Sequence, residues 1–72
     1  MTLDMLCPGE SATVRSIGES ALKRRLQELG LSDGTKISCL YESPLGDPVA
    51  FGFASGVVAL RRCDCAEVVL WD

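Results

Sequence analysis

Single glycine, proline and serine residues separate short apolar segments along the whole of this 72-residue chain. No segment is long enough to bury its apolar face by itself, and no repeat, low-complexity tract or linker interrupts the series. We therefore expect one domain over residues 1–72. A chain of this length buries only about 60% of the surface that it exposes when unfolded, so we expect a small core, a binding module and no deep catalytic cleft.

One of the apolar segments has the periodicity of a helix. Leucine recurs at i, i+4 and i+7 in Leu22, Leu26 and Leu29, while charged and polar residues occupy the other faces. Ser20 is suited to cap the start of this helix, and Gly30 followed by another leucine is typical of a C-terminal cap. The sequence therefore predicts a helix between Ser20 and Gly30.

The remaining apolar segments predict five strands, because they are rich in β-branched and aromatic residues. In the second of them, alternation places Ile37, Cys39 and Tyr41 on one face, and only Leu40 breaks the pattern. A hairpin should join the second strand to the third, which alternates in the same way. The expected strands cover residues 12–17, 35–42, 49–54, 57–61 and 68–71.

Strands this short are best buried as a curled sheet that closes on itself, with the helix covering one open end. We therefore predict a mainly β fold: a small five-stranded SH3-like barrel, with one α-helix inserted between the first two strands and a short helical turn before the last strand. Because small barrels have exposed edges, a weak homodimer is compatible with this fold.

Charge and composition exclude several classes of function. The chain has 7 basic and 10 acidic residues, and a net charge of −3 opposes binding to nucleic acid. No apolar run approaches the roughly 18 to 20 residues that cross a bilayer, and no signal peptide is evident, so we expect a cytoplasmic protein without direct membrane insertion. Histidine and phosphate-binding glycine loops are absent, and we therefore expect no enzymatic activity and no cofactor.

Several short motifs resemble those of the FeoA family and follow one another across nearly the whole chain. Each motif alone could occur by chance, whereas their combination at this spacing is specific. The motifs are Pro8-Gly9-Glu10, Arg25-Leu26 with Leu29-Gly30-Leu31 through Gly34, Pro44-Leu45-Gly46-Asp47-Pro48, and Ala59-Leu60-Arg61 leading to Ala66 and Val69.

The resemblance implies an SH3-like barrel without enzymatic activity of its own. It also implies a helper role towards FeoB, the ferrous iron permease that carries a GTP-binding domain. The same barrel resembles the C-terminal domain of iron-dependent repressors of the diphtheria toxin repressor type, but we expect no DNA-binding domain here. Two departures from the family stand out: Asp33 replaces a frequent proline, and Cys63 and Cys65 replace charged or polar residues.

The loop formed by Pro44, Leu45, Gly46, Asp47 and Pro48 is a candidate partner-binding site. Its prolines restrict the backbone, so the loop would lose little conformational entropy when it docks on a partner. The same residues would also be favoured by the geometry of a hairpin turn alone. We interpret the loop as one of two surfaces that contact FeoB.

The second candidate surface is basic and lies on the predicted helix. Arg24 and Arg25, with Lys23, could dock on an acidic surface of FeoB. They could equally form an ordinary solvated helix face, and Arg25 could hydrogen-bond within the domain. Arg61 and Arg62 would extend the patch if the fourth strand ended near the helix.

The cysteines suggest an alternative function, a thiolate-based metal-binding or metal-sensing protein that uses Cys63 and Cys65. Cys7 and Cys39 could complete a four-sulfur site, but they are isolated, whereas zinc sites usually combine two Cys-x(2–4)-Cys pairs. Neighbouring arginines could lower the pKa of one thiol of the pair. We expect reduced thiols and no metal site.

Overall fold

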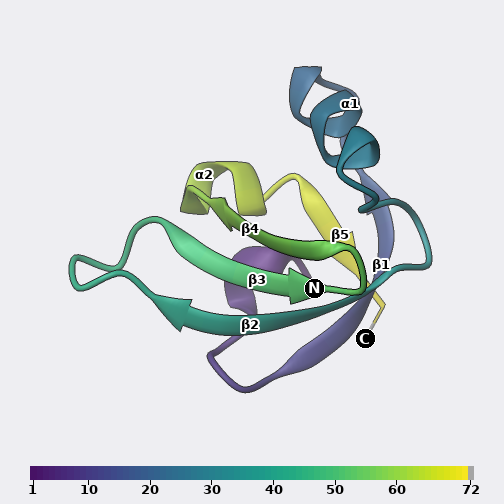
Figure 1. The fold of residues 1–72 in the computed structure, drawn as a ribbon. Coiled ribbons are helices and arrows are strands. Elements are labelled where there is room, and N and C mark those ends of the chain that lie inside the picture. The colour runs from purple at the N-terminus through teal and green to yellow at the C-terminus, as the bar shows by residue number, and fades with distance from the viewer. Residues whose placement is uncertain (72) are drawn as a thin grey trace.

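Five antiparallel strands form one sheet in the order β4-β3-β2-β1-β5 in the computed structural model, which describes residues 1–71 (Figure 1). The expected helix lies between the first two strands, and a helical turn precedes the last strand, as the sequence predicts. In chain order the elements are η1 (Leu3–Met5, a 3-10 helix), β1 (Ser11–Ile17), α1 (Ala21–Glu28), β2 (Lys36–Glu42), β3 (Val49–Phe53), β4 (Gly56–Leu60), α2 (Arg62–Cys65) and β5 (Val68–Leu70).

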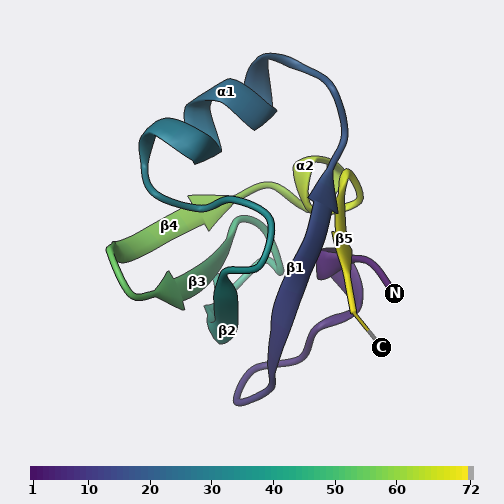
Figure 2. The same cartoon turned by 90° about the vertical axis from the view of Figure 1, so that its right-hand side faces the viewer.

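The strand β1 makes the sheet curl, because its two halves pair with different neighbours. Its first residues, from Ser11 to Thr13, pair with β2. Its later residues pair with β5, and the register shifts between Val14 and Ser16. Such a bulge bends a strand and increases its twist. The strands β2, β3 and β4 therefore face the pair β1 and β5 across the core. Figure 2 shows β1 and β5 side by side.

The space inside the curled sheet is filled by apolar side chains from every strand and from the segments that flank them. No polar or charged residue is fully buried among residues 1–71. Burial of one such large side chain contributes about 1.5 to 3 kcal/mol to folding. The largest fully buried side chains are Phe51, Leu3, Leu26, Leu31, Ile37 and Leu70.

The predicted alternation in β2 is correct for its first half and wrong for its second. Ile37 and Cys39 are buried, but Tyr41 is 61% exposed. The pairing of β2 with β3 shifts between Cys39 and Tyr41, so the residues beyond this bulge no longer keep the period of two. Leu40 lies across Gly52 of β3, where an added Cβ would be 3.3 Å from both methyl groups of the leucine.

The helix α1 ends as predicted but begins differently. Gly30 has a φ of 99° and donates its N–H to the carbonyl of Gln27, and Leu31 donates to the carbonyl of Leu26. These two bonds form a Schellman cap, which brings the buried Leu26 and Leu31 together. The expected cap by Ser20 is absent, because its hydroxyl donates to the carbonyl of residue 18 instead of accepting from the helix.

The first residues of the chain complete the core, a role that the sequence analysis missed. Leu3 is fully buried on η1, and Leu6 is 6% exposed. Thr2 forms a β-bridge with Val69 of β5. The Leu70 N–H also donates to the Met1 carbonyl at 2.7 Å. This segment therefore lies along β5 and packs beneath the sheet.

Candidate protein-interaction surfaces

The predicted loop of residues 44–48 connects β2 to β3 as a tight turn. Gly46 donates its N–H to the carbonyl of Ser43 at 2.7 Å, and Ser43 donates to the carbonyl of Pro48 at 3.1 Å. Gly46 has a φ of 84°, which a side chain would disfavour. The main chain of the loop is thus bonded to itself on both sides of its tip.

Arg62, at the start of α2, fastens this loop to the body of the domain. Its Nε donates to the carbonyl of Gly46 at 2.7 Å, and its guanidinium pairs with Glu42 at 2.7 Å. The backbone N–H of Arg62 donates to Asp47 Oδ1 at 3.0 Å. The hydrogen bond to Glu42 raises the pKa of Arg62. The helix α2, which is far from the loop in sequence, therefore holds the loop in one place.

Leu45 lies at the tip of the fastened loop and is 96% exposed, the most exposed large apolar side chain among residues 1–71. Its neighbour Gly46 is bonded to both Ser43 and Arg62. Because the surrounding backbone is already ordered, a partner that covers Leu45 would gain apolar contact at a small entropic cost.

The basic residues of α1 form a separate surface. Arg24 and Arg25 are exposed and have no ion-pair partner among residues 1–71, whereas Lys23 pairs with Glu19 at 2.6 Å. Figure 1 places α1 and the β2–β3 loop at opposite ends of the molecule. Arg62 lies at the loop end of the molecule. The expectation that it could extend the basic patch of α1 is therefore wrong.

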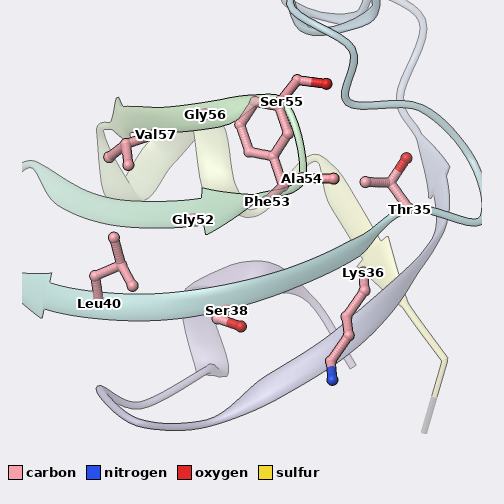
Figure 3. Close-up of a pocket in the computed structure, with 10 residues that line it drawn as sticks. All are labelled: Thr35, Lys36, Ser38, Leu40, Gly52, Phe53, Ala54, Ser55, Gly56 and Val57. Carbon is pink, nitrogen blue, oxygen red and sulfur yellow. The ribbon is translucent and has the colours of Figure 1, made fainter.

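A third surface feature, which the sequence analysis did not single out, is an open groove over β2, β3 and β4 (Figure 3). Its volume is about 720 Å³, and its walls include Leu40, Phe53 and Val57. Gly52 lies between them and contributes no side chain. A glycine inside an alternating strand often marks a close approach, and it was the available signal for this groove.

The cysteines do not come together as a metal site. Cys63 is exposed and Cys65 is buried, because residues two apart on a helix point in different directions. Burial raises the pKa of Cys65 to about 12, so the prediction of a lowered pKa is wrong for this thiol. Burial also raises the pKa of Cys39, and a hydrogen bond with Glu10 raises that of Cys7.

Metal coordination by thiolates requires deprotonated ligands within reach of one ion. Among residues 1–71, no group of three or more His, Cys, Asp or Glu side chains is placed to hold a metal ion. The geometry therefore offers no support for the alternative function based on Cys63 and Cys65.

The curled five-stranded sheet defines a small SH3-like domain. The family model described as the FeoA domain matches residues 1–70. The chain therefore belongs to the FeoA family, as its motifs indicated. No helix among residues 1–71 has the length and apolar character needed to span a membrane.

Similar proteins connect this family with ferrous iron transport. A curated relative from Porphyromonas gingivalis, an Fe(2+) transport protein A/Fe(2+) transporter FeoB fusion protein, is 35% identical over 69 residues. The match covers 94% of this chain but 8% of that relative. The chain thus corresponds to a small part of that fusion protein.

Two solved FeoA structures share the fold. The FeoA protein from Chlorobium tepidum is 35% identical with a TM-score of 0.90, over 97% of this chain and 68% of that one. The FeoA of Stenotrophomonas maltophilia, solved with zinc and described as a prokaryotic SH3 domain protein, is 32% identical with a TM-score of 0.86, over 99% and 89% of the two chains. These likenesses confirm the predicted SH3-like architecture.

Proposed function

We propose that this protein is a non-enzymatic cytoplasmic accessory of bacterial ferrous iron uptake that docks on the FeoB permease and its GTP-binding domain. The observation that carries the proposal is the fusion of an FeoA sequence to FeoB in the Porphyromonas gingivalis relative. Fusion keeps two domains at a high effective concentration, which favours an interaction between them. We infer that this domain makes the corresponding contact with its own permease.

The geometry supports docking through the outside of the domain. Leu45 offers an apolar anchor on a loop that Arg62 already holds. Arg24 and Arg25 offer positive charge that no carboxylate of residues 1–71 neutralises. We infer that the permease presents an apolar pocket to the first and acidic residues to the second, because such complementarity favours association and fixes orientation.

The test measures binding of the full chain to the detergent-solubilised permease of the same organism. We expect Leu45→Glu to weaken binding at least tenfold, and the double variant Arg24→Glu/Arg25→Glu to weaken it by a similar factor. Met5→Glu is the matched control, because Met5 is 62% exposed on η1 and belongs to neither surface. It should bind as the wild type does.

The results test separately whether the chain docks on the permease and whether the two proposed surfaces make the contact. If the wild-type chain does not bind the permease, the proposed function is wrong. If it binds and both sets of variants bind equally well, docking stands but the loop and the α1 patch are not its contacts. Circular dichroism of each variant shows whether the domain is still folded, so that a loss of binding can be assigned to the surface.

A further inference from the structure

The outer edge of β4 is an open edge of the sheet. β4 pairs with β3 from Val49↔Leu60 to Phe53↔Gly56, and no backbone hydrogen bond to its other side occurs within residues 1–71. The opposite end strand, β5, is partly covered by the bridge between Thr2 and Val69. Unpaired N–H and C=O groups along an edge can pair with another extended chain.

This edge lacks the features that usually prevent such pairing. Proteins protect free edges with lysine, proline or a bulge, but Gly56–Leu60 contains no charged residue and no proline. Its register with β3 also runs without a shift. Val57 is 67% exposed, and Ala59 is exposed as well. The strand is therefore suited to receive a partner strand.

The open groove lies beside this edge. Figure 3 shows Leu40 reaching from β2 towards Gly52, with Val57 on the β4 side of the same groove. Side chains of a strand alternate between its two faces, so every second side chain of a strand added to β4 would lie on the same face of the sheet as Val57 and the groove. The groove is apolar there, and it would accept apolar side chains.

β4 also connects the two surfaces proposed to contact the permease. It starts after the turn at Ser55, against which α1 ends: a Cβ on Gly30 would lie 2.7 Å from Ser55 Oγ. It ends at Leu60, two residues before Arg62, which holds the loop. An extended segment that follows β4 would therefore run from the C-terminal end of α1 towards the loop that Arg62 holds.

We propose that an extended, apolar segment of the permease pairs with the outer edge of β4 as an additional strand. The unpaired charges of Arg24 and Arg25 favour an acidic residue at the end of the segment that meets α1. This inference rests on the proposed docking and names the chemistry of the contact. It makes β4 the central contact, between the loop and the helix.

A second copy of the chain is a weaker candidate for this edge. A stable dimer buries about 800 Å² on each partner, roughly a fifth of the 4317 Å² surface of this domain. A five-residue strand is only about 17 Å long and supplies a small part of that area. Each copy also carries a net charge of −3, which opposes self-association.

The test introduces a charge on the edge and measures affinity for the solubilised permease. We expect Val57→Lys to raise the dissociation constant at least tenfold. Met5→Lys, at a similarly exposed position, should change it less than twofold. In hydrogen exchange of the wild type, the backbone amides of β4 that exchange freely in the isolated chain should slow at least tenfold when the permease is added. A side-chain contact alone would not protect these amides.

Each outcome decides the matter. Permease binding by the wild type with no loss in folded Val57→Lys, or no added protection in β4, overturns strand pairing and leaves the docking intact. Absence of wild-type binding removes the proposed function and this inference together. A third outcome is that the isolated chain sediments as a dimer that Val57→Lys converts to a monomer. That result would assign the β4 edge to a second copy of the chain and would overturn the proposal that a permease segment pairs with it.

Discussion

Replacement of Gly30 by alanine tests how α1 is held on the sheet. At φ +99°, a side chain costs about 1 to 2 kcal/mol. The added Cβ would also meet Ser55 Oγ at 2.7 Å and Ser55 Cβ at 3.2 Å, and overpacking of this kind costs about 1 to 3 kcal/mol. Because Ser55 is exposed and can shift, and because alanine restricts the unfolded chain, we expect a net loss of about 2 kcal/mol.

Gly34→Ala is the matched control for this variant. Gly34 has a φ of +89°, but nothing lies within 4 Å of an added Cβ, so this variant carries the backbone penalty alone. Urea unfolding followed by circular dichroism gives both free energies, and the Tm of Gly30→Ala should fall by roughly 8 to 16 °C. Ser55→Gly in the Gly30→Ala background should recover the contact part only. Equal destabilisation by Gly30→Ala and Gly34→Ala would refute the close approach of α1 to the β3–β4 turn.

Three further variants examine the loop, the groove and a buried thiol. Arg62→Gln should speed amide exchange at Gly46 while leaving the core amides unchanged, as hydrogen-exchange mass spectrometry can show. Gly52→Ala should change stability by less than about 1 kcal/mol, because the exposed Leu40 can move aside, but it should weaken permease binding by filling the groove. The pKa of Cys65 is raised from 9.0 to about 12, so the unfolded thiol ionises first, and stability should fall as pH rises from about 9 to 12. Thermal melts should show a smaller fall for Cys65→Ala.

Much of the fold follows from local patterns in the sequence. The leucine spacing and Gly30 predicted α1 and its C-terminal cap, since both depend on neighbouring residues. The side-chain direction in the second half of β2 could not be predicted from local patterns, because the bulge before Tyr41 arises from pairing with β3. The burial of Leu3 and Leu6 likewise depends on β5, more than sixty residues away.

Some features of the candidate sites could likewise be predicted from local sequence, and others depend on contacts between distant residues. The composition of the 44–48 loop was visible in the sequence, but the residue that fastens it, Arg62, comes from a distant helix. The groove and the open edge of β4 depend on strand order, which a sequence does not state. The different environments of Cys63 and Cys65 were accessible in principle, because neighbours two apart on a helix cannot share a face.

The bridge between Thr2 and Val69 also bears on how fast the domain folds. It joins residues more than sixty positions apart in the sequence, and the buried Leu3 and Leu6 belong to the same segment as Thr2. Contacts between residues so far apart require the closure of a long loop before they stabilise the chain, which slows folding. We therefore expect this domain to fold more slowly than a helical bundle of the same length.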